Sequence, residues 1–225
     1  MSDTSQGVVG VYDVLNQYQK IEEFSGFGDG PHELVVLEND TVAVAVGGIH
    51  TRGRTPVNID TMQPNLSYIS REGQLVDSVK LPNHQLSIRH LCRAKDKVIF
   101  GQQYAGEPTD VNLPLLASHS HSEGALEFQA TQEEWARFDN YIGSVAADEK
   151  YVLATSPRGN CYGIWSLQTH ELVELAILSD ACGVAVVNEA FTISSGAGKV
   201  VHDNIAERRR SFVSNIVWDN HWAAI

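Results

Sequence analysis

The sequence predicts an all-β protein, a β-propeller of four-stranded antiparallel blades. Short apolar runs alternate with Gly, Asn, Asp and Pro, which is typical of many short strands. Almost no segment has helical periodicity. One strand–turn–strand phrase also recurs along the chain with blade-like spacing. We therefore expect one propeller domain over residues 1–225, with four complete blades and a split or partial fifth.

Each predicted blade begins with an inner strand that is small or polar at its start and apolar afterwards. The first four such strands begin near residues 32, 90, 144 and 183. After each comes a short turn and a second strand that ends near Gly or Ser-Pro. The inner strands are PHELVVL (31–37), RHLC (89–92), GSVAA (143–147), CGVAVV (182–187) and NHWAAI (220–225), and the second strands are TVAVAVGG (41–48), KVIFGQQY (97–104), KYVLATSP (150–157) and AFTISSG (190–196).

The third and fourth strands of a blade are expected to form a hairpin. One helical exception interrupts the pattern, because Thr131 can cap a short turn that carries Trp135 and Phe138. The chain also opens with a hairpin that has no inner strands before it. The predicted hairpins are 7–24, 66–79, 115–128 and 161–175.

The leading hairpin and the trailing inner strand (220–225) can belong to one blade, which would close a five-bladed ring. A truncated larger ring is the alternative, and we prefer it. An open ring would leave strand edges and apolar blade faces exposed, so it predicts self-association into a homo-oligomer.

The charge of the chain excludes several classes of partner. Its net charge is −12, so it repels nucleic-acid phosphates and anionic lipid. No apolar run reaches the roughly 20 residues of a membrane helix, so we expect neither nucleic-acid binding nor membrane insertion. The first residues (1–6) have no signal-peptide pattern. The three cysteines lack metal-ligand spacing and are predicted to be small buried residues.

Histidines are the main candidates for function. Aligning the inner strands puts His32, His90 and His221 at equivalent positions, with Ser144 and Gly183 at the other two. Three imidazoles from three blades would then meet at one mouth of the channel. Neutral imidazoles bind first-row transition metals, so we predict a site for Fe or Cu.

The same face is predicted to hold further ligand-binding residues. An alternative to a metal is an anion such as a carboxylate or phosphate, held by arginine and histidine donors. Inner-strand histidines can also be purely structural. The supporting residues that we predict are His84, Arg89, Arg158, His50 and Tyr104.

The remaining candidates for chemistry are weak. His119, His121, His170 and His202 fall in or near predicted outer strands, and we expect them to be exposed to solvent. No nucleophile elbow, paired-carboxylate pattern or Cys-His pair occurs at useful spacing. We therefore predict no catalytic residues.

Several phrases resemble the bacterial family called domain of unknown function 1513. The resemblance runs from about residue 7 to the C-terminus and rests on GDGPHEL (28–34), VGGIHT (46–51), NIDTMQPNLSYI (58–69), HQLSIRHL (84–91), YIGSVA (141–146), ATSPRGN (154–160), CGVA (182–185) and WDNH (218–221).

This resemblance implies a periplasmic seven-bladed propeller, exported by the twin-arginine route. Genes of this family often neighbour those of imelysin-like peptidases and di-haem oxidoreductases, a setting linked to iron acquisition. The family has no established activity. Compared with that pattern, we expect this chain to lack the usual signal and the first blades and to match the C-terminal two thirds of the family.

Three functional hypotheses follow. The first is a non-enzymatic protein that binds a metal, a metal chelate or a redox partner in periplasmic iron uptake. The second is an enzyme with an active site at the channel mouth, similar to lactonases or quinoprotein dehydrogenases. Channel-mouth carboxylates would favour it, yet only Glu33 and Asp219 lie next to the inner-strand positions. The third is an interaction scaffold that uses the rim of the ring.

Overall fold

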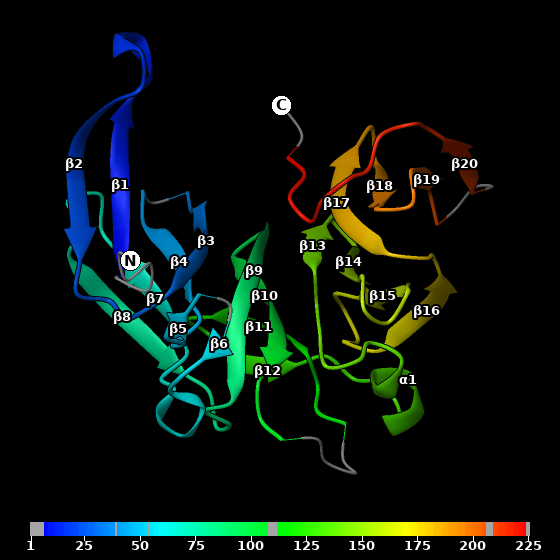
Figure 1. Ribbon diagram of the computed structural model, residues 1–225, viewed down its shortest axis with the longest axis horizontal. Coiled ribbons are helices and arrows are strands. Elements are labelled where there is room, and N and C mark those ends of the chain that lie inside the picture. Colours follow the sequence, from blue (N-terminus) through cyan, green and yellow to red (C-terminus); the bar gives the residue numbers. More distant parts are fainter. Residues whose placement is uncertain (1–6, 39, 54, 108–111, 206–208, 224–225) are drawn as a thin grey trace. The chain divides into compact units, whose positions relative to one another are not determined.

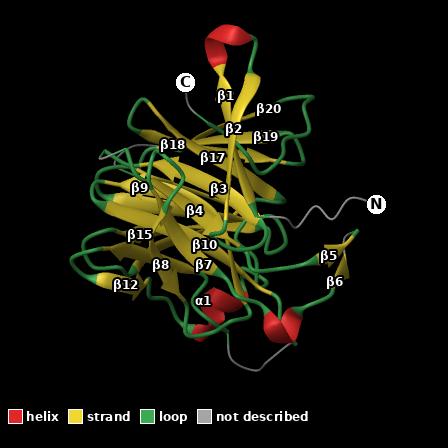
Figure 2. Cartoon of the chain, turned by 90° about the vertical axis from the view of Figure 1, so that its left-hand side faces the viewer, coloured by secondary structure: helices red, strands yellow, loops and turns green. Residues whose placement is uncertain are grey.

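The fold is nearly all β, as a computed structural model shows (Figures 1 and 2). The structure describes residues 7–38, 40–53, 55–107, 112–205 and 209–223. The chain divides into two compact units, Met1–Arg89 and His90–Ile225. Among the described residues, no helix is long and apolar enough to cross a membrane.

The first unit consists of a hairpin and one four-stranded sheet. The sheet has the order β3-β4-β7-β8, and all its neighbouring strands are antiparallel. A second small hairpin lies in the loop between β4 and β7. The strands are β1 (Val8–Asp13), β2 (Gln19–Ser25), β3 (Pro31–Val36), β4 (Val42–Val46), β5 (Thr51–Arg52), β6 (Thr55–Pro56), β7 (Asn65–Ile69) and β8 (Leu75–Lys80).

The core of the first unit joins the hairpin β1–β2 to the sheet. Val44 and Ile69 of the sheet are buried, and Phe24 of β2 packs against the same cluster. Gly73, in the turn before β8, allows this packing. A Cβ atom there would lie 2.1 Å from the ring of Phe24, and its φ of +76° also favours glycine.

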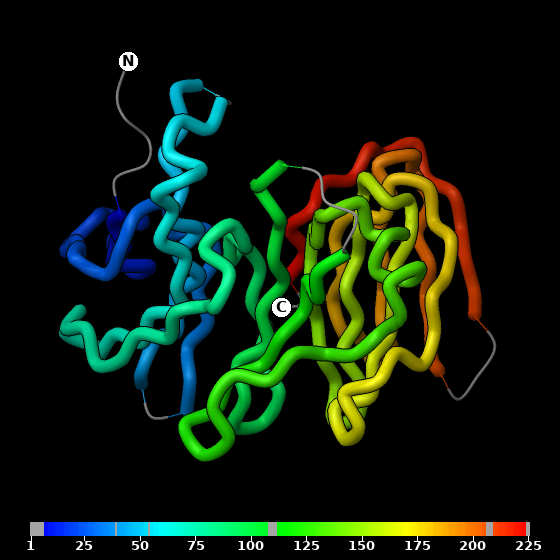
Figure 3. Tube along the Cα trace, turned by 90° about the horizontal axis from the view of Figure 1, so that it is seen from below, coloured from blue at the N-terminus to red at the C-terminus, as the bar shows by residue number. Residues whose placement is uncertain are grey.

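The second unit contains three four-stranded sheets in chain order, which follow one another from green to red in Figure 3. β9 begins in the last residues of the first unit. The strands are β9 (Leu86–Ala94), β10 (Lys97–Tyr104), β11 (Leu116–Ser120), β12 (Gly124–Glu127), β13 (Ser144–Ala147), β14 (Tyr151–Ser156), β15 (Cys161–Ser166), β16 (Leu172–Ile177), β17 (Ala181–Val187), β18 (Ala190–Ser195), β19 (Lys199–Asp203) and β20 (Arg210–Val213).

The sheets of the second unit pack face to face. β10 lies against the segment that enters β13, where a Cβ atom at Gly101 would be 2.5 Å from the side chain of Ile142. The next interface buries Leu153, Val184 and Phe191 in one hydrophobic cluster. Small residues on the facing strands let the sheets approach closely.

A short helix, α1 (Gln132–Ala136), joins the first and second of these sheets. Thr131 caps it through a capping box with Glu134. Trp135 of the helix stacks on Trp165 of β15, with ring centroids 5.4 Å apart. The indole of Trp165 also donates a hydrogen bond to the carbonyl of Gln129, at 3.1 Å.

The structure confirms the predicted fold class, because several four-stranded antiparallel sheets form a propeller-like, all-β protein. The predicted second strand 97–104 matches β10, and the predicted helix forms at its predicted cap. The single propeller domain and the closure of the ring remain predictions.

The predicted trailing inner strand (220–225) is wrong for the residues described. Residues 220–223 are not in a strand, and 224–225 lie outside the described residues. The backbone N–H of Asn220 donates to the carboxylate of Asp219 at 2.7 Å instead of joining a ladder. A local side-chain hydrogen bond thus competes with strand pairing.

The helix cap gives a stability prediction. We expect Thr131→Ala to lower the free energy of unfolding by about 1 kcal/mol, because it removes the oxygen that accepts from the Glu134 N–H. Thr131→Ser keeps that oxygen and should change stability much less. Urea unfolding followed by tryptophan fluorescence measures both, and equal losses in the two variants would contradict the capping role.

Candidate metal and ligand site

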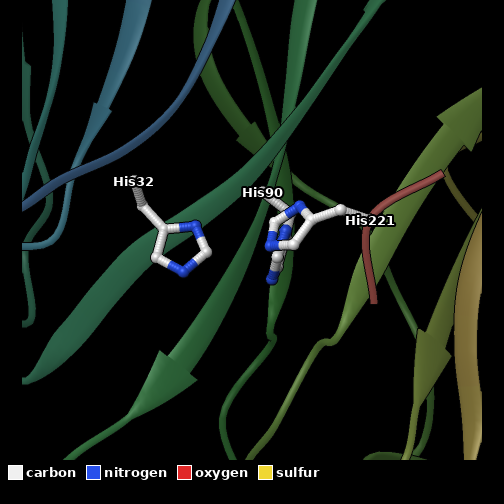
Figure 4. Close-up of side chains that lie close together, drawn as sticks. All are labelled: His32, His90 and His221. Carbon is white, nitrogen blue, oxygen red and sulfur yellow. The ribbon is translucent and has the colours of Figure 1, made fainter. Parts of the chain in front are cut away.

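Two of the predicted metal ligands lie side by side in the second unit. His90 is in the middle of β9 and is only 2% exposed, whereas His221 is exposed. Their ring centroids are 5.2 Å apart with an interplanar angle of 47°, and their ligand nitrogens lie within 4.8 Å of each other (Figure 4). Two nitrogens bound to one tetrahedral metal are about 3.3 Å apart. A small rotation of the exposed His221 ring would bring the two histidines to that separation.

The segment that carries His221 is held against β17 by its tryptophans. Trp218 donates a hydrogen bond to the hydroxyl of Ser214 at 3.2 Å, and its ring meets that of Trp222 edge to face. A Cβ atom at Gly183 would lie 3.0 Å from Trp222. Gly183, which the repeat aligns with the histidines, therefore leaves room for the segment that supplies one of them.

Ser144 is the other residue at the repeat position, and it has a structural role. Its hydroxyl is buried and accepts a hydrogen bond from the backbone N–H of Val184 at 3.3 Å. This bond joins two neighbouring sheets across their interface. The inner-strand position thus serves packing in two sheets and carries a histidine in another.

Arg158 and Tyr104 lie on the same part of the second unit as Tyr141. The guanidinium of Arg158 stacks 4.3 Å above the ring of Tyr141. Tyr104 ends β10, and its backbone N–H donates to the carbonyl of Asn140 at 3.0 Å. The side-chain amide of Asn220 donates to the hydroxyl of Tyr141 at 3.4 Å, which ties the His221 segment to this group.

Sequence reasoning did not assign a role to Tyr141 or Asn220. Both lie in the motif phrases YIGSVA (141–146) and WDNH (218–221), which was the one available signal. Their contact joins residues 79 positions apart, and no local pattern specifies such a contact.

The other predicted site residues belong to the first unit. His32 is exposed on β3, beside a hollow of about 210 Å³ that Val8 and Gly10 of β1 also line. His50 Nε2 lies 2.8 Å from a carboxylate oxygen of Asp29, so one of its ring nitrogens is already bonded. His84 is exposed in the turn before β9, and Arg89 is half-buried on β9.

The remaining histidines differ in part from the prediction of solvent exposure. His121 is exposed, but His119 is buried, because both faces of β11 are covered. His170 is half-buried and contacts the ring of Phe128, and this burial is the main cause that lowers its pKa. His202 is half-buried and lies 3.0 Å from the hydroxyl of Thr192.

The structure adds a pocket of about 820 Å³ at the C-terminal ends of β9, β13 and β17. Lys95 and Lys150 line it together with Tyr151 and Phe191. Glu149 contributes opposite charge, so the lining does not select one class of ligand. The sequence offered no motif for it.

The fold is that of a propeller-like, all-β protein, and the His90–His221 pair is its candidate site. The model of the family described as "Protein of unknown function (DUF1513)" matches residues 1–225. The chain therefore belongs to this family, as its motif phrases predicted. Among curated proteins, no match was found.

The buried cysteines give a pH-dependent prediction. Burial raises the pKa of Cys161 and of Cys182 to about 11, so at pH 8 only about one thousandth of each is the reactive thiolate. We expect both to react with a disulfide reagent more slowly than half-buried Cys92, and to react faster as the pH rises towards 11. Peptide mapping of the native protein checks this. Rapid labelling of Cys161 at pH 8 would contradict it, and all three should react at similar rates in guanidinium.

Proposed function

We propose that this protein is a non-enzymatic binding protein that holds a transition-metal ion, Fe or Cu, with His90 on β9 and His221 on a loop. The observation that supports this most is the approach of His90 and His221, whose ligand nitrogens lie within 4.8 Å. Imidazole nitrogen suits Fe and Cu, whereas Ca²⁺ prefers oxygen ligands. The donors therefore favour a transition metal over Ca²⁺, and the choice of Fe or Cu within that class comes from the family resemblance.

The two histidines would contribute in different ways. His90 is buried within a strand, so its ring has few alternative positions and is pre-organised for binding. His221 lies on a loop segment and is exposed, so it can adjust to complete the coordination geometry. A rigid ligand combined with an adaptable one suits a site that takes up and releases its ion.

His32, in the first unit, stays a third ligand predicted from the sequence repeat alone. It occupies the repeat position equivalent to His90. Three imidazoles leave at least one coordination position for water or an exchangeable ligand. Such an open position is compatible with binding a metal together with a chelating molecule.

The physiological setting is proposed from the family resemblance alone. A periplasmic location and partners among iron-uptake or redox proteins would fit a reversible Fe or Cu site. An enzyme of the lactonase or quinoprotein type is the competing proposal. Clear turnover of a lactone with added Ca²⁺ would favour that alternative.

The proposed metal site predicts how much Cu²⁺ affinity each histidine variant loses. Wild-type protein should bind about one Cu²⁺ ion per chain in isothermal titration calorimetry. Replacing both His90 and His221 by alanine should weaken the affinity by at least about 100-fold, because loss of even outer partners of metal ligands costs roughly 10- to 100-fold. His32→Ala alone should weaken it about tenfold.

His121→Ala is the matched control, because His121 is exposed in the turn between β11 and β12. It should bind Cu²⁺ as the wild type does. Circular dichroism of each variant establishes that the β fold is kept. An unchanged affinity in the folded His90→Ala/His221→Ala variant would rule out the proposed site.

Self-association is a second proposed property, and exposed strands support it. Among the described residues, β1 and β2 pair only with each other, and Tyr12 and Ile21 on them are exposed. β20 likewise exposes Phe212 and Val213. Unpaired edges beside apolar side chains are templates for pairing with another chain.

Sedimentation velocity tests this proposal. The wild-type sedimentation coefficient should rise with protein concentration, and Ile21→Lys should suppress the rise by placing a charge on the exposed face of β2. Gln74→Lys, in an exposed turn of the same unit, is the control and should associate as the wild type does. A concentration-independent monomer in the wild type would exclude self-association.

A further inference from the structure

We propose that Arg158 and Tyr141 form a seat for a carboxylate that also coordinates the bound metal. The ligand of the site would then be a metal together with a small carboxylate, and not a bare ion. The coordination of the metal by this carboxylate rests on the metal site proposed above. The anion seat itself is built from contacts within the second unit.

The loop that carries Arg158 has a fixed conformation. The hydroxyl of Ser156 donates to the carbonyl of Phe138 at 2.7 Å and accepts from the N–H of Gly159 at 3.0 Å. A Cβ atom at position 159 would lie 1.9 Å from the carbonyl oxygen of Arg137, so a glycine is needed there. Arg158 therefore projects from an anchored turn, which lowers the entropy lost when it binds a ligand.

The guanidinium is oriented but still available for an anion. Its Cζ atom lies over the ring of Tyr141, 4.3 Å from the ring centroid. A guanidinium has five N–H donors, so a contact of this kind with one ring leaves donors for an anion. Arg158 is exposed, and among the residues that the structure describes its side chain forms no ion pair with a carboxylate. An oriented guanidinium with available edges matches the two oxygens of a carboxylate.

Tyr141 connects this seat to the proposed metal site. Its hydroxyl accepts from the side-chain amide of Asn220, and the next residue is His221. The imidazole of His221 in turn lies beside that of His90. One tyrosine thus contacts both the cation that would hold the anion and the segment that supplies a metal ligand.

Carboxylate is the anion that fits both partners. Its two oxygens can pair with the guanidinium, while a second carboxylate of the same molecule supplies an oxygen ligand to Fe or Cu. Malonate is a suitable probe because it has two carboxylates on one carbon. Inorganic phosphate serves as the comparison anion, and it should bind less tightly than malonate when the metal is present.

Malonate is titrated into wild-type protein and Arg158→Gln, each with and without saturating Cu²⁺. Arg158→Gln keeps hydrogen-bond donors but removes the positive charge and the planar guanidinium that can pair with both oxygens of a carboxylate. We expect Cu²⁺ to strengthen malonate binding in the wild type, and Arg158→Gln to weaken it about tenfold, a typical effect of losing a charge-assisted hydrogen bond. Arg71→Gln is the control, because Arg71 is exposed in the turn between β7 and β8.

Tyr141→Leu tests whether Arg158 must be held by the ring of Tyr141 or whether the positive charge of Arg158 is enough to bind malonate. It keeps an apolar side chain but removes the ring face, so malonate affinity should fall although Arg158 is still present. Combined with Arg158→Gln, it should cause little further loss, because the two residues act as one unit. Fully additive losses would contradict the stacked seat.

The outcomes distinguish the two proposals. If Cu²⁺ binds but malonate affinity is the same in wild type and Arg158→Gln, the carboxylate seat is wrong and the metal site stands. If Cu²⁺ does not bind but malonate binding still depends on Arg158, the metal site is wrong and the anion seat stands without its metal. If neither binds, both are overturned.

Discussion

The rest of the second unit depends on the close face-to-face packing of successive four-stranded sheets. Leu153, Val184 and Phe191 fill the interface between the last two sheets, and Ser144 bonds across it to the backbone of Val184. Such packing permits only small residues where the strands approach most closely. Ser144 and Gly183 occupy this repeat position in two sheets because the packing there needs small side chains. On β9 the equivalent position is His90, whose side chain can bind a ligand.

The same constraint places the histidine pair. His90 is buried because β9 is covered on both faces, and His221 reaches it because Trp222 fits over Gly183. A Cβ atom at position 183 would lie 3.0 Å from Trp222, so this segment would have to shift by a few tenths of an ångström. The glycine on β17 therefore helps to place the segment that carries His221. Tyr141 extends it by contacting both Asn220 and Arg158.

Much of the fold could be predicted because strands, turns and caps are local. The repeated inner-strand phrase located β3, β9, β13 and β17, and Thr131 located the helix. The repeat alignment selected His90 and His221, but the strand predicted around His221 is a loop, so the repeat does not explain why the two rings lie close together. The burial of His119 could not be predicted correctly. A strand on the outside of a blade is expected to be exposed unless the elements that cover it are known.

The sequence by itself determined the all-β class and the approximate bounds of most strands in the four-stranded sheets, because each depends on neighbours within a few residues. Only the tertiary structure decided that residues 220–223 form a loop and not a strand, that Trp222 covers Gly183, and that Arg158 stacks on Tyr141. Those features depend on contacts between residues tens of positions apart. Their energies come from packing and from hydrogen bonds between sheets, which no local pattern in the sequence records.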